Sequence, residues 1–404
     1  MYQPKHIIIV GGGAAGFFAA LMAKAANPAL TVTIVEAAGQ MLRKVSVSGG
    51  GRCNVTHACF DPRELVKFYP RGNKELLGAF HKFQPRDTLD WFAARGVPLK
   101  TEADGRVFPV SDSARSIVDC LTHEARRLNV SVRVNAAVNA VKKMADGRFA
   151  LTFAGGDRLA ADHLLLACGG TCNISGARLA AALGHSLSAP VPSLFSFRVN
   201  DERLGNLSGV TVPNVTVSAG GLRQSGPLLI THEGLSGPAI LRLSAWGARW
   251  FAGENYRFTV SVDWTGGQNI GEQFTANRRH AGKRQLRNDP PFAIPRRLWE
   301  RLLATAEIPA DRHWHDLRKS GEETLTRALT MTQFQVTGKS VNKEEFVTCG
   351  GIPLREVDFR AMTSKLCPGL YFAGEILDLD ALTGGFNLQA AWTTGWLAGQ
   401  SMAR

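Results

Sequence analysis

Three glycines near the N-terminus have the spacing of a phosphate-binding turn. Gly11, Gly13 and Gly16 form a GxGxxG pattern directly after the apolar run 7–10, which predicts a buried parallel strand. In such a turn the first glycine allows a tight bend, the second lets the backbone approach a pyrophosphate, and the third lets the following helix pack closely on the strand. The pattern therefore predicts that a dinucleotide binds here.

An acidic residue at the expected distance supports this prediction. A second strand predicted at 31–35 ends in Glu36, which lies 20 residues after Gly16, where the ribose of a dinucleotide needs a hydrogen-bond acceptor. The alanine-rich stretch 17–26 predicts the intervening helix, whose N-terminal amides face the phosphates. Ala15 lies in the same turn and joins the residues expected to hold the pyrophosphate.

Two further glycine-rich phrases could enclose the same cofactor. The phrase SVSGGGRCN at 46–54 contains three successive glycines, which predict a backbone that passes close to a flat or anionic group. The phrase GLYFAGE at 369–375 lies near the other end of the chain. An NAD-dependent dehydrogenase needs no second, distant glycine phrase around its cofactor, so the combination favours FAD. No second GxGxxG unit follows, so we expect NAD(P)H to visit the flavin only transiently as an electron donor.

The elements that must position these phrases indicate a discontinuous nucleotide-binding domain. Helical patterns at 64–80, 85–95 and 113–128 and strand patterns at 130–134, 137–143, 148–153 and 164–168 follow the second glycine phrase. From about 190 the pattern changes to antiparallel strands, with a short helix predicted at 238–250, and then to a basic helical stretch. A strand pattern at 341–347 leads back to the C-terminal phrase. We therefore predict an FAD-binding domain at 1–190 and 348–404, a β-barrel-like domain at 191–268 and 331–347, and a basic helical domain at 269–330.

Composition limits the class of protein. The 404 residues are 45% hydrophobic and 20% charged, which is ordinary globular composition. No apolar span is long enough to cross a membrane, and the N-terminus lacks the order of a signal peptide, so we expect a cytoplasmic protein with no membrane partner. The spacing of the seven cysteines matches no metal-site pattern, so neither a metal nor disulfides are expected. We expect the protein to be a monomer or a weak oligomer.

The charge distribution suggests an anionic partner. There are 47 Lys and Arg against 34 Asp and Glu, a formal net charge of +13. A local excess occurs at 278–301, where Phe292 and Trp299 lie among basic residues, as in a surface that combines phosphate contacts with base stacking. The candidate RNA-binding residues of this stretch are Arg278, Arg279, Lys283, Arg284, Arg287, Arg296, Arg297 and Arg301. A solvated basic helix face is the alternative interpretation.

Four phrases in order resemble one family along essentially the whole chain. GGGAAG, SGGGRCN, THEGLSGPAIL and GLYFAGEILDLDALTGGFNLQAAWTTGWLAG are similar to the BaiN-like FAD-dependent oxidoreductases, bacterial flavoproteins described as ribosomal RNA dihydrouridine synthases, bile-acid reductases and aminoacetone oxidases. The resemblance implies an α/β fold with a Rossmann-like FAD domain of the glutathione-reductase type and inserted β-barrel-like and helical domains. The phrase TCNISGAR after Gly170, and Cys349 in VTCGGI, depart from the usual pattern and indicate a distinct subgroup.

The resemblance and the motifs together predict the cofactor contacts. Beyond the first turn and Glu36, they comprise Arg43, Lys44, Ser48, Gly49, Gly50, Gly51, Arg52, Cys53, Asn54, Val138, Gly169, Gly170, Gly374, Glu375, Asn387, Leu388 and Gln389. The last three are expected to begin a helix whose free amides face the pyrimidine edge of the flavin. Arg52 is also a candidate anchor for an anionic substrate or flavin charge.

The reaction expected of such a site is reduction of an electron-poor double bond, with a side chain as proton donor. Cys349 is the first candidate acid, and Cys53 and His232 are the alternatives. For each of these three residues, a purely structural role is the alternative to catalysis. Three functions remain possible from the sequence: reduction of uracil in ribosomal RNA or a ribosome precursor, oxidation or reduction of a small molecule such as an amine or enone, and RNA binding by a flavoprotein without turnover.

Overall fold

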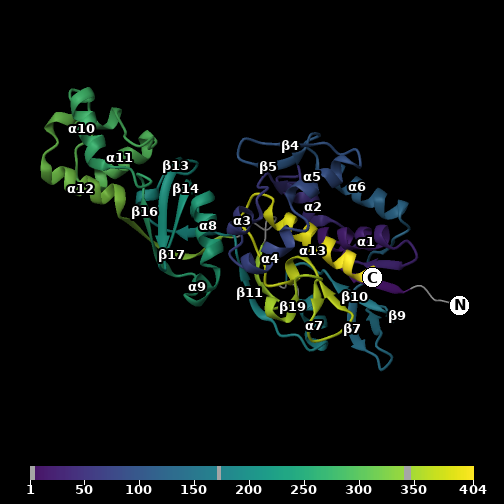
Figure 1. Ribbon diagram of the computed structural model, residues 1–404. Helices are drawn as coiled ribbons and strands as arrows, with labels where there is room; N and C mark the ends of the chain where they lie inside the picture. Colours follow the sequence, from purple (N-terminus) through teal and green to yellow (C-terminus); the bar gives the residue numbers. More distant parts are fainter. Residues whose placement is uncertain (1–4, 171–173, 341–346) are drawn as a thin grey trace. The chain divides into compact units, whose positions relative to one another are not determined.

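The chain forms two compact units (Figure 1). The computed structural model describes residues 5–170, 174–340 and 347–404. Unit 1 comprises Met1–Val191 and Val347–Arg404, and unit 2 comprises Pro192–Phe346. The α/β fold predicted from the sequence is confirmed, because unit 1 contains a mostly parallel sheet and unit 2 a closed barrel.

A seven-stranded sheet forms the centre of unit 1, in the order β19-β20-β21-β10-β1-β2-β6. The five strands from β21 to β6 run parallel, and β20 and β19 add an antiparallel edge. Their bounds are β1 His6–Val10, β2 Thr31–Val35, β6 Ser131–Arg133, β10 His163–Leu166, β19 Val357–Asp358, β20 Thr363–Ser364 and β21 Leu370–Phe372. Ile7, Ile8 and Ile9 of β1 are fully buried, as expected for a central parallel strand covered on both faces.

Smaller sheets and the helices complete unit 1. Strands β3 Thr56–His57, β4 Leu99–Thr101 and β5 Arg106–Pro109 form one sheet, β7 Val138–Lys143, β8 Phe149–Phe153 and β9 Arg158–Ala161 a second, and β11 Ser188–Pro192 and β18 Thr348–Gly351 a third. The helices are α1 Ala14–Ala26, α2 Arg43–Val47, α3 Pro62–Leu65, α4 Asn73–Phe80, α5 Pro85–Ala93, α6 Ala114–Arg127, α7 Ile174–Ala182 and α13 Phe386–Met402.

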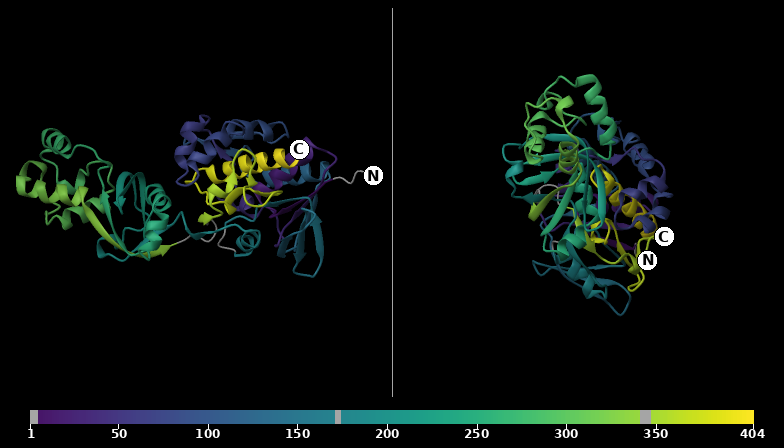
Figure 2. Two further views of the ribbon diagram at one scale, coloured as in Figure 1. Left: turned by 60° about the horizontal axis from the view of Figure 1, so that its bottom comes forward. Right: turned by 90° about the vertical axis from the view of Figure 1, so that its left-hand side faces the viewer.

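The two ends of the chain build one domain. Strand β21 pairs with β10, which pairs with β1, so a C-terminal strand extends the N-terminal sheet. Helix α13 packs along α1, and Figures 1 and 2 show the two helices side by side. A Cβ at Gly395 would lie 2.7 Å from the Ala15 carbonyl oxygen, and one at Gly399 would lie 2.5 Å from that of Ala19. These glycines of α13 therefore allow a helix contact too close for any side chain.

Unit 2 is built on a six-stranded closed barrel in the order β12-β15-β14-β13-β16-β17. The strands are β12 Ser196–Val199, β13 Thr211–Ala219, β14 Leu222–Thr231, β15 Gly234–Ser236, β16 Phe258–Asp263 and β17 Thr332–Ser340. Along β17, buried and exposed residues alternate from Thr332 to Thr337, which places one face toward the barrel interior. Helices α8 Pro238–Trp246 and α9 Ala248–Gly253 follow β15, and α8 packs on β14 and β13.

Three helices are inserted between β16 and β17: α10 Ile270–Ala281, α11 Arg296–Thr305 and α12 Lys319–Thr330. Figure 2 shows these green helices grouped beyond the barrel strands. Their apolar faces join the barrel interior in a single buried cluster that includes Trp264, Trp299 and Trp314. The division of unit 2 into separate barrel and helical domains, with the bounds given above, stays a prediction.

Several sequence expectations need correction. The helix expected at 64–80 is interrupted, because Gly72 has the left-handed φ of 87° and starts α4 separately. The helix expected at 238–250 divides at Gly247, where the backbone leaves helical geometry (φ −92°, ψ 8°). Most of the strand expected at 341–347 lies outside the described residues. Within the described part of the chain, no helix combines the length and apolar character that crossing a membrane requires.

Candidate functional site

The predicted nucleotide phrases meet at one edge of the parallel sheet. Strands β1, β2, β10 and β21 run parallel and end, respectively, at the glycine turn, at Glu36, before Gly169 and before Gly374. Ligands of open α/β sheets bind outside the carboxyl ends of the strands. Parallel pairing therefore brings together four segments that are far apart in the sequence.

Two of the three glycines in the first turn are required by the protein itself. A Cβ at Gly11 would lie 2.3 Å from the Ala167 carbonyl oxygen, and one at Gly16 would lie 2.0 Å from the carbonyl oxygen of Gly11. Gly11 also has a φ of 116°, which side chains rarely adopt. These two glycines let the strand turn directly into α1.

Gly13 is different because nothing in the protein requires it to be a glycine. A Cβ there would meet no atom within 4 Å, and its φ is an ordinary −91°. Gly13 is the N-cap of α1, so the unpaired amides of the first helical turn lie beside this open space. An open space in front of free amides fits the pyrophosphate of a dinucleotide.

Glu36 holds the glycine turn in place. Its Oε2 accepts a hydrogen bond from the Gly12 amide at 2.8 Å, and its Oε1 accepts one from the Ala38 amide at 2.8 Å. The side chain is half-buried. A carboxylate of this kind keeps lone pairs to accept further hydrogen bonds from ribose hydroxyls, as the sequence predicts.

The SGGGRCN phrase forms a tight loop after α2. Gly49, Gly50 and Gly51 have φ values of 59°, 69° and 84°. The loop closes through a hydrogen bond from the Cys53 amide to the Ser48 carbonyl oxygen at 2.9 Å. Side chains at Gly50 and Gly51 would meet no atom within 4 Å. The loop thus presents bare backbone, which suits a flat ring system beside it.

The C-terminal phrase is tied to this site through Glu375. Its Oε2 accepts a hydrogen bond from Lys44, and its Oε1 accepts one from the Thr348 amide at 3.0 Å. A Cβ at Gly170 would approach the Thr348 hydroxyl to 2.5 Å and Glu375 Oε1 to 3.1 Å. Segments predicted separately as cofactor contacts therefore converge on one carboxylate.

Helix α13 begins at Phe386, one residue before the predicted start. The amides of Asn387 and Leu388 belong to the first turn and have no acceptor within the helix. The expectation for Gln389 was wrong, because its amide donates to the Gly385 carbonyl oxygen at 3.0 Å. Its side chain is fully buried and accepts hydrogen bonds from Thr56 and Thr88 at 2.6 and 2.9 Å. The backbone amide and the side-chain oxygen of Gln389 are therefore both engaged within the protein.

The loop before α13 is held by the other predicted side chains. Asn387 binds the backbone of Ala381 through both its oxygen and its nitrogen, each at 3.0 Å. With its amide oriented to satisfy its neighbours, Asn54 accepts from the Gly385 amide at 3.0 Å and donates to the Thr56 carbonyl oxygen at 3.0 Å. These residues position the N-terminus of α13.

Arg52 does not have a free charge to offer a substrate. Its Nη1 donates to Glu102 at 2.6 Å and lies 3.3 Å from Asp112. The guanidinium also stacks on the Phe108 ring at 3.9 Å from the centroid. The expectation that Arg52 anchors an anion is therefore not supported by its contacts, which instead brace the glycine loop.

Two more predicted contacts differ in their surroundings. Arg43 is exposed on α2. Val138 is buried at the start of β7, beside a register shift between Val138 and Ala140. Its predicted backbone contact with adenine stays a prediction.

The three candidate acids lie in different environments. Cys349 is fully buried in β18, between Thr348 and two glycines with left-handed φ. Cys53 is also fully buried, and this burial raises the pKa of its thiol to about 12. His232 is exposed in the turn between β14 and β15. Of the three, only His232 reaches solvent, and the Cys53 thiol holds its proton throughout the physiological pH range.

His57 was missed by the motif analysis. It lies three residues after the SGGGRCN phrase, and its ring stacks on that of Phe386, the first residue of α13, at 4.6 Å and 22°. Its Nε2 lies 3.2 Å from the Asp104 carbonyl oxygen, whereas its Nδ1 is buried without a hydrogen-bond partner in the described chain. A lone histidine close to a glycine phrase was the only available signal.

Burial of His57 predicts a pH effect. Desolvation lowers the pKa of the His57 imidazole below its ordinary value of about 6.5. As the pH falls through 6.5, the unfolded chain gains a proton that folded His57 resists, so stability decreases toward acid. We expect His57→Gln to lose less thermal stability than the wild type between pH 7 and 5.5. Equal losses in thermal unfolding scans would contradict this assignment.

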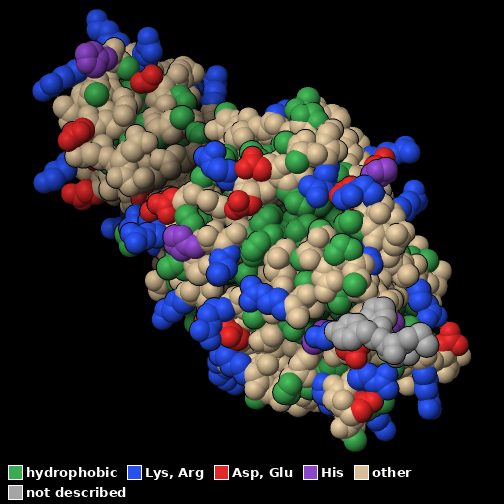
Figure 3. Space-filling view, turned by 45° about the vertical axis from the view of Figure 1, so that its right-hand side comes forward, with side chains coloured by type: hydrophobic (Ala, Val, Ile, Leu, Met, Phe, Trp, Pro, Cys, Tyr) green, Lys and Arg blue, Asp and Glu red, His purple; other side chains and the backbone are tan. Residues whose placement is uncertain are grey.

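The basic residues predicted to contact RNA are only partly available. Three of them form ion pairs: Arg278 with Glu322, Arg284 with Asp289, and Arg296 with Glu300. Two others donate hydrogen bonds, Arg287 to the Gln285 side chain and Arg301 to the Gly205 carbonyl oxygen. Arg279, Lys283 and Arg297 are exposed and form no ion pair with any described residue. Figure 3 shows Lys and Arg side chains on the surface of unit 2, at the upper left.

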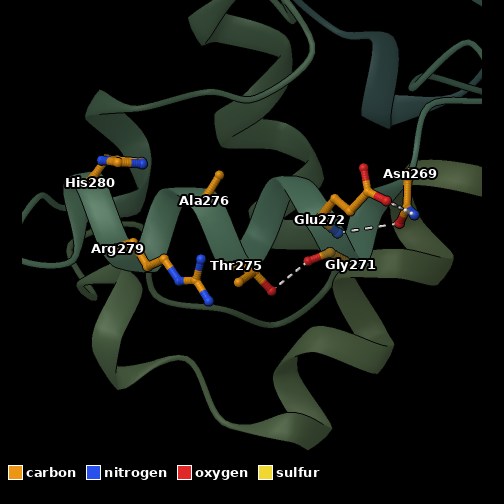
Figure 4. A pocket seen from close by; sticks show the side chains of 7 residues that line it. All are labelled: Asn269, Gly271, Glu272, Thr275, Ala276, Arg279 and His280. Carbon is orange, nitrogen blue, oxygen red and sulfur yellow. Dashed lines mark hydrogen bonds between the residues drawn. The ribbon is translucent and has the colours of Figure 1, made fainter.

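The aromatic part of that prediction was wrong. Trp299 is fully buried and donates to the Leu286 carbonyl oxygen at 2.6 Å, and Phe292 packs against the same core. The pocket on α10 is lined by none of the predicted nucleotide phrases. Figure 4 shows its lining residues, from Glu272 in the first turn of the helix to Arg279 and His280 in the last.

Comparisons with known proteins agree with this geometry. The family described as HI0933-like protein Rossmann domain matches residues 5–401. A ribosomal RNA dihydrouridine synthase of Escherichia coli is 32% identical, covering 98% of this chain and 97% of its own. A 3-dehydro-bile acid delta(4,6)-reductase of Clostridium scindens is 31% identical, covering 99% of each chain.

Solved structures show the same fold. A 3-ketosteroid-delta4-(5alpha)-dehydrogenase from Rhodococcus jostii superposes with a TM-score of 0.54 at 14% identity, covering 100% of this chain and 98% of the other. A flavocytochrome c3 fumarate reductase gives 0.53 at 16% identity, covering 99% and 78%. At such low identity these similarities concern the architecture alone.

Proposed function

The chain belongs to the HI0933-like Rossmann-domain family of FAD-dependent oxidoreductases, and from that premise we propose that it reduces an electron-poor carbon–carbon double bond. The proposed substrate is uracil in ribosomal RNA, and the proposed electron donor is NAD(P)H. One observation carries the proposal: two full-length relatives of nearly equal identity are named for making dihydrouridine and for reducing a double bond in a bile acid. Making dihydrouridine from uridine and reducing a delta(4,6) bile acid each saturate a carbon–carbon double bond.

The residues at the sheet edge fit FAD. The open space at Gly13 and the first-turn amides of α1 would hold the pyrophosphate, and Glu36 would accept the adenosine ribose. The bare backbone at Gly50 and Gly51 would lie beside the ring system. Once bound and reduced by the proposed NAD(P)H donor, FAD would supply a hydride to the electron-poor carbon of the substrate.

The protein would supply electrostatics and a proton. The free amides of Asn387 and Leu388, at the positive end of α13, would stabilise negative charge on the pyrimidine edge of the flavin. The Cys53 thiol stays protonated, but its full burial keeps it from solvent. Cys349 and His232 remain the other candidate acids.

Uracil in RNA is favoured over a free small molecule by charge. The net charge of +13 would attract a polyanion and would contribute little to binding a neutral enone. The exposed cations Arg279, Lys283 and Arg297 would contact phosphates. The second candidate function, reduction of a small cyclic enone, is favoured by the bile-acid relative. A cytoplasmic location stays a prediction.

A deletion strain tests the substrate. We expect ribosomal RNA from a strain lacking this protein to lose dihydrouridine at a discrete position, measured by mass spectrometry of nuclease fragments. Re-expression of the wild-type chain should restore the modification. Unchanged dihydrouridine in the deletion strain would exclude uracil in ribosomal RNA and leave the small-molecule reductase as the better proposal.

A further inference from the structure

Two tryptophans of unit 2 remain exposed on the α8 and α9 helices. Trp246 at the end of α8 keeps 36% of its surface accessible, and Trp250 in α9 keeps 40%. Three other tryptophans of the same unit, Trp264, Trp299 and Trp314, are fully buried. Exposed indoles cost free energy unless a partner covers them, so this pair marks a candidate binding surface.

One of the two indoles is held rigidly. A Cβ at Gly220, in the turn between β13 and β14, would lie 2.6 Å from the Trp250 ring. The Trp250 ring also packs against two phenylalanines, with centroid distances of 5.1 Å to Phe251 and 5.7 Å to Phe258. Trp250 is thus fixed by its neighbours while part of its surface faces solvent. A fixed aromatic surface loses little entropy when a ligand stacks on it.

The two helices that carry these indoles contain charged residues of one sign only. Residues 238–253, which form both helices, include Arg242 and Arg249 and no acidic residue. Arg242 and Trp246 are four residues apart on α8 and therefore share a face. Arg242 is exposed, and its Nη1 donates to the Ser225 carbonyl oxygen at 3.3 Å. The nearest acidic residue in the sequence is Glu254, immediately after α9.

We propose that this surface, formed by Arg242, Trp246, Arg249 and Trp250, binds single-stranded RNA by base stacking. The inference rests on the proposed function, since it names where the RNA substrate is held. Indole surfaces accept any base, and arginines beside them contact phosphates or stack themselves. The basic helices α10 and α11 cannot do the same, because their aromatic residues are buried. They offer phosphate contacts alone.

The test measures RNA binding by the FAD-loaded full-length protein. The probe is a fluorescently labelled single-stranded oligouridine, and the readout is anisotropy over a range of salt concentrations. We expect Trp246→Ala and Trp250→Ala each to weaken binding about tenfold, with the salt dependence unchanged. Arg242→Ala should lower the slope of log affinity against log salt by about 0.7. Met331→Ala, which removes an exposed apolar side chain outside this surface, is the matched control and should bind like the wild type.

Each outcome decides the proposal. Because Trp250 packs on Gly220 and Phe258, its variant is accepted only if circular dichroism and the flavin absorption spectrum match the wild type. The Trp246 variant, which leaves these contacts in place, serves in either case. Wild-type affinity in both tryptophan variants would overturn the proposal, and a gain or loss of self-association would assign the surface to a second copy of the chain instead. If the deletion strain loses dihydrouridine but the tryptophan variants bind RNA as tightly as the wild type, this surface is rejected and the proposed function is retained. If the wild-type protein does not bind RNA, the proposed surface is rejected. If the deletion strain keeps its dihydrouridine, the proposed function itself is wrong.

Discussion

Replacing Gly13 with valine is expected to lower the affinity for FAD about 100-fold while the protein still folds. The physical reason is that the Gly13 Cβ position is empty of protein atoms to 4 Å and has an ordinary backbone conformation. A valine side chain would therefore occupy the space assigned to the pyrophosphate. Valine is a poor N-cap, so we expect a loss of up to about 1 kcal/mol in the unfolding free energy of the apoprotein. Fluorescence titration of the apoprotein with FAD measures the affinity.

Two control glycines separate cofactor loss from unfolding. Gly16→Val should prevent stable folding, because its Cβ would lie 2.0 Å from the Gly11 carbonyl oxygen. Gly78→Ala in α4 should leave FAD binding unchanged and stabilise the fold by about 0.5–1 kcal/mol, since its Cβ position is also open. Wild-type FAD affinity in Gly13→Val would show that the pyrophosphate lies elsewhere.

Replacing Asp380 with asparagine is expected to destabilise the protein by about 3–5 kcal/mol. Asp380 is fully buried and receives two hydrogen bonds from Arg71, one from Nε and one from Nη2. Without the carboxylate, the largely buried guanidinium of Arg71 loses this ion pair. Urea unfolding at pH 7 measures the effect, and flavin release should accompany it because this pair anchors the loop that leads into α13.

Control variants distinguish this buried pair from ordinary ion pairs. Arg360→Gln removes an exposed partner of Asp358, and we expect it to change stability by less than about 1 kcal/mol. Replacing both Arg71 and Asp380 with apolar residues should recover part of the loss, because both charges of this pair are then removed. An Asp380→Asn variant as stable as the Arg360→Gln variant would refute the assigned role of the pair.

The nucleotide-binding half of the protein could be predicted from the sequence because its signals are local. Gly11, Gly13, Gly16 and Glu36 are read from the alternation of strand, turn and helix, and the family resemblance drawn from the four phrases is confirmed by the match to residues 5–401. The Rossmann-type FAD fold with an inserted barrel is confirmed as well. The individual cofactor contacts stay predictions, and Gln389 and Arg52 show where the structure limits them.

Other features depend on which side chains the fold buries. The amphipathic pattern of 296–305 places Trp299 in a helix but does not say which face packs on the barrel, so its burial was not foreseen. The exposure of Trp246 and Trp250 was equally hidden, because it depends on how α8 and α9 cover the barrel strands.

The sequence by itself determined the cofactor class, since the spacing of the glycines and Glu36 is a local requirement of dinucleotide binding. Only the tertiary structure decided how the distant segments meet. Glu375 pairs with Lys44, and His57 stacks on Phe386, through contacts between residues hundreds of positions apart. Such contacts arise because strands and helices from the two chain ends pack together, and the spacing of residues along the sequence does not specify which distant elements pair.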